Sequence, residues 1–279
     1  MSVINTNVNA LFAQSAMKTN AREMSSAMQQ LSTGTRINSA KDDAAGLAIG
    51  QSMTSQIRGL NQAVRNANDG VNMMQTAEGA MVEQSNMLQR MRELAVQASN
   101  GTYSSTQRGY LDAEFSALTS QIGDITSQTS WNGIQLLDGT SKVGYTATSG
   151  SFDFQVGQSS GQVISVSISS LSTTDLAISG LSLSTASGAS GAIDTIDSAI
   201  DTINSTRADI GAGINRLTYA ADNLSNISAN VSASRSTVLD TDYASASTQL
   251  SKAQIIQQAS TAMLAQANQQ PQTVLALLK

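Results

Sequence analysis

The sequence predicts a mainly α-helical fold, in which the N- and C-terminal segments form a long coiled-coil-like helical bundle around a small β insertion. Apolar residues recur with a period of about 3.5 over long segments, which is typical of helices that supercoil on partner helices. The only proline is Pro271, so almost nothing prevents very long helices. Aromatic residues make up only 4% of the chain, which suits narrow seams of small side chains better than a compact core.

Each end of the chain is predicted to form one helix with a thin apolar stripe. The N-terminal stripe consists of Ala10, Ala13, Met17, Ala21, Met24, Met28 and Leu31. The C-terminal stripe consists of Ala253, Ile256, Ala259, Met263 and Ala267, and is followed by Val274, Leu275, Leu277 and Leu278.

Two such helices bury little apolar area by themselves, so an isolated pair is expected to fray. We therefore predict seams that other copies of the chain complete, at Met17, Met24, Met28, Leu31, Ile256, Met263, Val274 and Leu277. An ordinary closed bundle is the alternative.

The stretch LSTGTRINSAKDD, residues 31–43, is predicted to separate the first helix from a much longer one. Gly34 and its Ser and Thr neighbours break the preceding helix. Ser39, with Asp42 three residues on, fits a capping box for the next helix. The glycine spacing GLAIG at 46–50 lacks the Lys-Ser/Thr of a phosphate-binding loop, so the stretch indicates a helix start and not a nucleotide site.

The long helix is predicted from a sustained seam of apolar residues. Its members are Ile49, Met53, Ile57, Leu60, Val64, Ala67, Val71, Met74, Met81, Leu88, Met91, Ala95 and Ala98. Such a helix extends roughly 90 Å, so partner helices must run beside it. Four glycines inside it, each costing up to about 1 kcal/mol, pose a difficulty that close helix approach could explain: Gly50, Gly59, Gly70 and Gly79.

Two further segments keep the same spacing and are predicted to be these partners. The shorter follows a turn around Gly101 and carries Leu111, Phe115, Leu118, Ile122 and Ile125. The longer carries Ile193, Ile196, Ile200, Ile203, Ile210, Ile214, Leu217, Ala221, Leu224 and Val231. We expect the three segments to pack lengthwise, with the chain running out, part-way back, and out again.

The segment between the two partner helices differs in composition, being rich in Ser and Thr, and is predicted to be the β insertion. We expect it at the far end of the elongated helical bundle. Phe152, Phe154 and Val156 alternate with polar residues, as do Ile164, Val166 and Ile168, and QSSG at 158–161 fits a hairpin turn between them. WNGIQLL at 131–137 adds an Asn-Gly turn. Disorder is the alternative for this Ser/Thr-rich segment, whose surface could accept O-linked sugars.

These elements predict three parts of the chain. Residues 1–40 and 240–279 form a terminal helical domain, residues 41–138 and 192–239 form a helical bundle, and residues 139–191 form the variable Ser/Thr-rich insertion.

The composition excludes several kinds of chemistry. With no His and no Cys there is no Ser-His-Asp triad, Cys nucleophile, disulfide or Cys/His zinc site, and no cofactor or metal is predicted. A net charge of −5 and a pI near 4.7 argue against a nucleic-acid partner. The sequence contains no run of 18 apolar residues, so no membrane span is predicted. The first ten residues show no cleavable secretory signal.

The remaining candidates for catalysis are three carboxylate clusters. Asp42 and Asp43 are explained by helix capping. Asp112 and Glu114 lie two residues apart, so on a helix they point to different faces. Asp240 and Asp242 lie in the predicted joint before the last helix. We do not expect an enzyme.

The chain resembles bacterial flagellins in four collinear blocks. These are INTNVNAL at 4–11, LSTGTRINSAKDDAAGLAI at 31–49, QRMRELAVQASNGT at 89–102 and SKAQIIQQASTAMLAQANQQPQTVLALL at 251–278. With the seam between them, the resemblance covers about residues 1–138 and 192–279. One departure is Trp131, where the family often has Phe, and only the packing of its turn should change.

The resemblance implies a subunit that self-assembles into the flagellar filament for swimming motility. Paired terminal helices would form an inner tube and fold on polymerisation, the bundle would form an outer tube, and the insertion would point to solvent. The resemblance also implies export through the flagellar channel to an extracellular filament. The implied partners are other copies of the chain, an export chaperone, and cap and hook-associated proteins, without a membrane or nucleic acid.

The resemblance further implies recognition by host innate immune receptors. The positions that match a Toll-like receptor contact are Arg90, Leu94 and Glu114, with Arg90 and Leu94 one turn apart on a shared face. Leu275, Leu277 and Leu278 match residues seen by cytosolic inflammasome sensors. Two alternative functions remain at this point: a hook-filament junction protein with similar ends, and a chemoreceptor-like signalling coiled coil, which would lack a β insertion.

Overall fold

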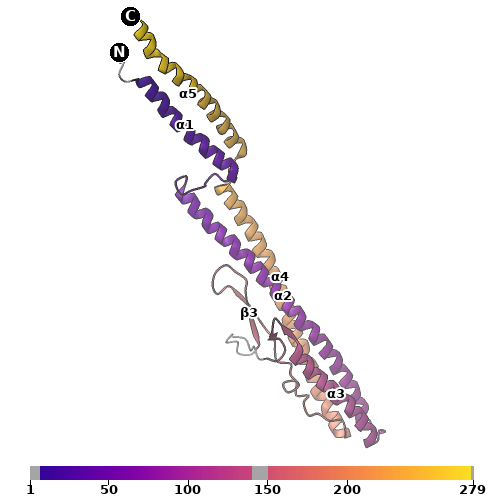
Figure 1. Ribbon diagram of the computed structural model, residues 1–279. Helices are drawn as coiled ribbons and strands as arrows, with labels where there is room; N and C mark the ends of the chain where they lie inside the picture. The colour runs from indigo at the N-terminus through magenta and orange to yellow at the C-terminus, as the bar shows by residue number, and fades with distance from the viewer. Residues whose placement is uncertain (1–6, 140–149, 278–279) are drawn as a thin grey trace. The chain divides into compact units, whose positions relative to one another are not determined.

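The computed structural model describes residues 7–139 and 150–277, with side chains up to residue 269 (Figure 1). Its helices are α1 (Val8–Thr33), α2 (Ala44–Ser99), α3 (Ser105–Gln128), α4 (Ala186–Leu239) and α5 (Tyr243–Leu277). The strands form two antiparallel hairpins, β1 (Ser130–Trp131) with β2 (Ile134–Gln135) and β3 (Ser151–Gln155) with β4 (Val163–Ser167). The predicted mainly α fold with a small β insertion is confirmed. Within the described ranges, no helix is long and apolar enough to cross a membrane.

The chain divides into two compact units, and both α2 and α4 run through the division. The terminal unit comprises residues up to 57 and from 229 onward, and the central unit comprises residues 58–228. The terminal unit extends further into the chain than the terminal domain expected at 1–40 and 240–279. The reason is that the start of α2 and the end of α4 contact each other, with the side chain of Leu239 packed on Gly50.

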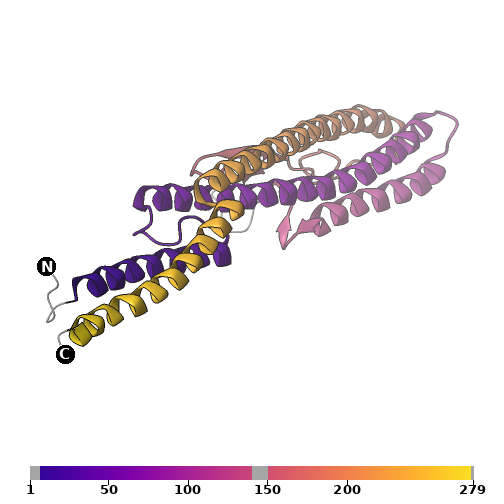
Figure 2. The ribbon, with the colours of Figure 1, turned by 90° about the horizontal axis from the view of Figure 1, so that it is seen from above.

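In the central unit, α2, α3 and α4 lie side by side (Figures 1 and 2). Helix α4 is antiparallel to α2, because Arg92 pairs with Asp197 near one end of the unit, whereas the Ser228 hydroxyl donates to Asn61 near the other. The expectation that the chain runs outward again in its last long segment is therefore wrong.

The direction of α4 is set by the segment that precedes it. This segment returns to the start of α3, where the carboxylate of Asp112 accepts hydrogen bonds from the backbone N–H of Leu183 and the hydroxyl of Ser182. The chain must enter α4 from that end, so α4 runs back along α2, parallel to α3.

The core of the central unit follows the predicted seams. On α4 the buried residues recur every three or four positions: Ala189, Ala192, Ile196, Ala199, Ile203, Thr206, Ile210, Gly213, Leu217, Ala221, Leu224 and Ser228. On α2 they include Leu60, Ala67, Met74, Met81, Leu88, Met91, Ala95 and Ala98, as predicted. The first predicted member, Ile49, is instead 49% exposed. At that level α2 meets α4 through the neighbouring Gly50.

The β3–β4 hairpin has the predicted strands and turn, but its predicted place at the far end of the bundle is wrong. Phe152 pairs with Val166 and Phe154 with Ile164. The hairpin packs along the middle of the helices, where Phe154 covers Gly70 of α2 and Val166 covers Gly213 of α4.

The hairpin takes this position because α3 does not cover the whole of α2. Beyond the end of α3, the small clusters around Leu60 and Ala67 are covered by Phe154, Val156 and Ile164 of the insertion. Gly70 and Gly213 leave room for the side chains of Phe154 and Val166. This close packing explains the glycine at position 70 of α2. Gly79, in contrast, has no neighbour within 4 Å of the position of an added methyl group.

Two local expectations have different outcomes. The Asn-Gly turn is confirmed, since Asn132 and Gly133 both adopt positive φ angles, 49° and 78°, as a two-residue hairpin turn requires. The cap of α2 is Asp43 and not Ser39: the Asp43 carboxylate accepts from the Gly46 N–H at 2.8 Å. Ser39 and Asp42 instead close the turn just before the helix, where the Ser39 hydroxyl donates to Asp42 at 2.8 Å.

We expect Gly70→Ala to destabilise the central unit by about 1–3 kcal/mol, because the added methyl group would lie 2.8 Å from the ring of Phe154. Gly79→Ala is the matched control in the same helix, and there the better helix propensity of alanine should stabilise the unit by up to about 1 kcal/mol. Urea unfolding followed by circular dichroism measures both variants. Shifts of the same sign would contradict the packing of the hairpin on Gly70.

Candidate functional site

The α1·α5 pair is the part of the molecule with the thinnest core. The two helices lie side by side and antiparallel, with the start of α1 and the end of α5 at the same end (Figures 1 and 2). Among side chains described up to residue 269, those buried on this pair are Asn20 and Ala27 on α1 and Ala246 and Ala253 on α5. On each helix the two are seven residues apart, which is one heptad. The pair therefore closes around three alanines and one amide.

Two asparagines fix the alignment of this pair. The Asn20 amide donates to the Ala253 carbonyl at 2.8 Å and to the Gln257 side chain at 3.1 Å. Near the ends of the helices, the Asn7 amide donates to the Ala267 carbonyl at 2.8 Å. The carbonyl oxygen of Asn20 is buried and accepts no hydrogen bond from any described residue. Buried amides of this kind set helix register at a cost in stability.

Sequence reasoning placed Ala21 in the stripe and missed the neighbouring Asn20. The signal that could have found it is its spacing: Asn20 lies three residues after Met17, four before Met24 and seven before Ala27. An amide at a seam position is therefore readable as a register device, once the correct face of the helix is known.

One face of the α1·α5 pair carries an apolar groove. It has a volume of about 540 Å³ and is lined mainly by Phe12, Ala13, Ala16, Ile256, Ala259 and Met263. Phe12 is 72% exposed and Met263 64% exposed. Such large apolar side chains in solvent mark a surface that a partner covers. Phe12 was not among the predicted seam residues, although it is one of only four phenylalanines.

The other predicted seam residues have varied surroundings. Ile256 lies in the groove, Met28 is half exposed, and Met17, Met24 and Leu31 are partly buried on α1. For Val274, Leu275 and Leu277 the backbone is helical as part of α5, but their side chains lie outside those described. Leu278 lies outside the described residues.

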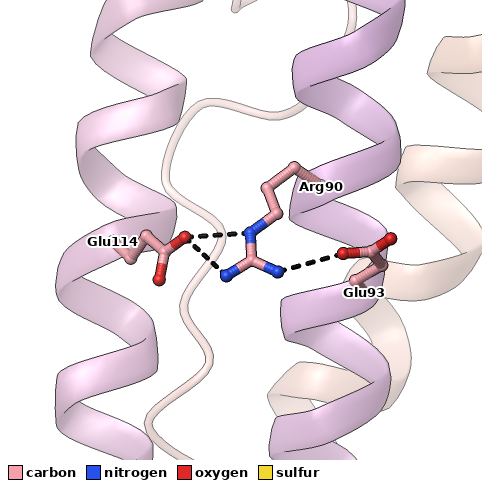
Figure 3. A network of polar contacts seen from close by, with 3 residues as sticks. All are labelled: Arg90, Glu93 and Glu114. Atoms are coloured by element: carbon pink, nitrogen blue, oxygen red, sulfur yellow. Dashed lines mark hydrogen bonds and ion pairs between the residues drawn. The ribbon is translucent and has the colours of Figure 1, made fainter.

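A surface ion-pair network joins α2 to α3 (Figure 3). Arg90 donates to Glu114 across the two helices at 2.9 Å and to Glu93 on its own helix at 3.0 Å. The hydrogen bond to Glu114, reinforced by that to Glu93, raises the pKa of the Arg90 guanidinium. The Arg90 and Glu114 side chains are both about half exposed.

Leu94 does not share this surface. It is 1% exposed and belongs to the core of the central unit, so the prediction that it lies on one face with Arg90 is wrong. Leu94 is buried together with Leu88, Met91 and Ala95 of α2, whereas Arg90 points outward. The Leu94 side chain is therefore not accessible to a partner in this structure.

The carboxylates considered for catalysis form hydrogen bonds or ion pairs with neighbouring backbone and side-chain groups. Asp42 accepts from the Ser39 N–H in the turn before α2, Asp43 caps the start of α2, and Asp112 holds the segment before α4. Asp242 accepts from the Ala244 N–H at the start of α5, and Asp240 accepts from the Ser236 hydroxyl. In the part of the chain that the structure describes, no three acidic side chains gather to hold a metal ion.

Two family models match the chain. "Bacterial flagellin N-terminal helical region" matches residues 4–142, and "Bacterial flagellin C-terminal helical region" matches residues 193–278. A flagellin of Halalkalibacterium halodurans is 42% identical over 279 residues, covering 99% of this chain and 100% of its own. A flagellin of Treponema pallidum is 38% identical over 285 residues, with the same coverage of both chains.

Two solved structures are similar to this chain in fold. The crystal structure of Bacillus cereus flagellin is 32% identical with a TM-score of 0.50, and covers 57% of this chain and 88% of its own. A candidate flagellar hook-associated protein from Vibrio parahaemolyticus has a TM-score of 0.58 and covers 71% of this chain and 100% of its own. At 15% identity, the second likeness concerns the fold alone.

We expect Asp197→Asn to make the central unit less stable at neutral pH and equally stable in strong acid. The hydrogen bond from Arg92 lowers the pKa of Asp197, so the stability that this pair contributes is present above the ordinary carboxyl pKa of about 4. It is lost as the pH falls through the lowered pKa of the folded state. Urea unfolding midpoints of the unaltered chain and of Asp197→Asn, measured at pH 7, 4 and 2.5, give the difference in stability at each pH.

Asp201→Asn, an exposed aspartate on the same helix, is the control for removing one negative charge. A deficit of Asp197→Asn that stays constant down to pH 2.5 would contradict the assigned role of the ion pair.

Proposed function

Because the chain belongs to the bacterial flagellin family and is a structural subunit of a flagellar filament, we propose that its α1·α5 pair is the surface through which copies join. The single observation that carries this proposal is the apolar groove on that pair, with Phe12 and Met263 largely exposed. A copy that covers the groove removes these side chains from water. Burial of apolar area is the main driving force of such association.

Growth of a filament also requires that the joining surfaces differ. Identical copies that join head to tail, through faces that are not self-complementary, form an open helix and can add without limit. The α1·α5 pair carries the apolar groove and, adjoining it at Ile256, a more polar groove that includes Glu23, Lys252 and Gln249. We propose that these grooves meet a different surface of the next copy.

We propose that the two terminal helices complete their folding when a copy joins. Fixing the backbone of one residue costs about 1–2 kcal/mol, whereas burying one methylene group contributes about 0.8 kcal/mol. With three buried alanines at its centre, the pair has little to set against the cost of ordering two helices. Contacts with neighbouring copies supply the burial that is missing.

Family membership supports further proposals about where the subunit acts and which proteins it binds. The subunit is exported to an extracellular filament that serves swimming motility. Its partners along that route are an export chaperone and the cap and hook-associated proteins. The resemblance of the terminal blocks, which end in the ALL of residues 276–278, supports this proposal.

A hook-filament junction protein is the other function that the fold allows. The likeness to a candidate hook-associated protein extends over 71% of this chain, but it rests on the fold. Identity of 42% to a flagellin along the whole chain favours the filament subunit. The chemoreceptor-like alternative predicted no β insertion, whereas the β3–β4 hairpin is part of the core of the central unit.

Seeded growth tests the proposed function and the groove together. Subunits dissociated in acid and added to short filament seeds should lengthen them, as seen by electron microscopy. Phe12→Ser should slow elongation roughly tenfold or more, because losing a large apolar anchor weakens an interface by at least about 1.4 kcal/mol.

Phe12→Leu is the matched control, since it keeps an apolar side chain at the same position and should retain most of the rate. Both variants should keep the helix content of the subunit, because Phe12 is 72% exposed. Elongation by Phe12→Ser at the unaltered rate would remove the groove from the joining surface. Failure of the unaltered subunit to elongate seeds would favour the junction protein.

We propose a second role for the surface ion pair on α2 and α3, as a contact for a Toll-like receptor on host cells. Arg90 and Glu114 present opposite charges from two helices on one accessible face. Leu94 would act only by packing beneath this face, since it is buried. Recognition of Leu275, Leu277 and Leu278 by cytosolic inflammasome sensors is proposed from the resemblance alone.

Arg90→Ala should lower receptor activation by about tenfold, because truncating a charged interface residue commonly costs 1–2 kcal/mol. Arg92→Ala is the matched control on the same helix, since Arg92 also forms a half-exposed ion pair, with Asp197. A reporter cell line that expresses the receptor measures both. Equal loss in the two variants would indicate a general effect on the bundle and would contradict the assigned contact.

A further inference from the structure

The described methionines span a wide range of exposure, from fully buried to largely exposed. In the central unit, Met73, Met74, Met81 and Met91 are at most 5% exposed. On the α1·α5 pair, Met263 is 64% exposed and Met28 is 50% exposed. A thioether in solvent reacts with peroxides, whereas a buried one is protected. A dissolved subunit therefore presents Met28 and Met263 to an oxidant, while the four buried methionines stay shielded.

Met263 has a second property that Met28 lacks. Its side chain lines the apolar groove together with Phe12 and Ile256, which is the surface proposed to be covered when copies join. Met28 lies on α1 outside the residues that line this groove. A chemical change at Met263 therefore acts on the joining surface itself, whereas the same change at Met28 acts elsewhere on the pair.

We propose that Met263 is an oxidation site at which hydrogen peroxide stops assembly of the free subunit, an inference that rests on the proposed function. The sulfur lone pair attacks one oxygen of the peroxide, so an S–O bond forms and the O–O bond breaks. The hydroxide that departs takes up the proton of the oxygen bound to sulfur, and leaves as water. Sulfur is oxidised by two electrons and the peroxide is reduced by two.

The product blocks joining because methionine sulfoxide is polar. Its S=O group is a strong hydrogen-bond acceptor in a groove lined mainly by Phe12, Ile256 and alanines, with Asn9, Ser260 and Gln266 as its polar members. A neighbouring copy that covers this groove with apolar side chains would have to remove the polar S=O group from water, which is unfavourable. Once a filament has formed, the same burial excludes peroxide from the sulfur. The site is therefore open to oxidation before assembly and closed after it.

The experiment treats full-length subunits and preformed filaments with hydrogen peroxide. Peptide mass spectrometry then gives the extent of oxidation at each methionine. In free subunits we expect Met263 to be oxidised at least about tenfold faster than Met74 and Met81, and in filaments we expect it to be protected. Seeded elongation by the oxidised subunit should slow about tenfold or more, as expected when a polar group enters a dry contact.

Substitution assigns the effect to one residue. Met263→Leu keeps the size and apolar character of the side chain, so it should elongate seeds before and after peroxide treatment. Met28→Leu should remain sensitive to peroxide. Treatment of the oxidised subunit with methionine sulfoxide reductases should restore elongation.

Two results would overturn the inference: Met263→Leu subunits that lose elongation as fully as the unaltered chain, or unaltered subunits that elongate normally with Met263 oxidised. Failure of the untreated chain to elongate seeds would instead overturn the proposed function. The mass spectrometry arm separates the cases, because the selectivity for Met263 in the free subunit is measured without any assembly.

Discussion

The narrowness of the α1·α5 contact is the constraint on which the other features depend. The central unit buries twelve residues along α4 alone, whereas the α1·α5 pair buries four side chains in all among those described. Three of these four are alanines, whose methyl groups remove little area from water. Large side chains such as Phe12 and Met263 point away from this contact into solvent. A chain that places its small residues inside and its large ones outside leaves most of its apolar burial to be made with other molecules.

The central unit solves the opposite problem, how to remain stable by itself over the length of a long helix pair. Helix α3 covers only part of α2, and the β3–β4 hairpin covers the next part. The glycines of α2 and α4 make this possible, because a side chain at Gly70 or Gly213 would collide with Phe154 or Val166. Their cost in helix propensity is offset by the burial of those side chains. The β3–β4 hairpin is thus part of the core of the central unit.

The helical seams and both hairpins could be predicted from the sequence, because periodicity and Asn-Gly or Gly-containing turns are local signals. The path of the chain could not. The direction of α4 depends on Asp112 binding the backbone at Leu183, a contact between residues 71 positions apart that no local pattern reveals. In the candidate site, Ile256 and Met263 were predicted, whereas Phe12, Asn20 and the inward direction of Leu94 were not. All three misses concern the choice between adjacent faces of a helix, which a stripe of small residues specifies only weakly.

The asparagines at the α1·α5 contact fit the same constraint. A seam of alanines can slide by one heptad at little cost, because every methyl group meets a similar neighbour in the new register. A slide by one heptad would separate the Asn20 amide from the Gln257 side chain, and the Asn7 amide at the end of the pair from the Ala267 carbonyl. The penalty for the wrong register therefore comes from polar groups, not from packing. The proposed joining surface needs one register in every copy, since a slip of one heptad, about 10 Å, would displace Phe12 relative to Met263 and divide the groove. The buried carbonyl oxygen of Asn20 accepts no hydrogen bond from a described residue, and this lowers the stability of the pair in exchange for a uniform register.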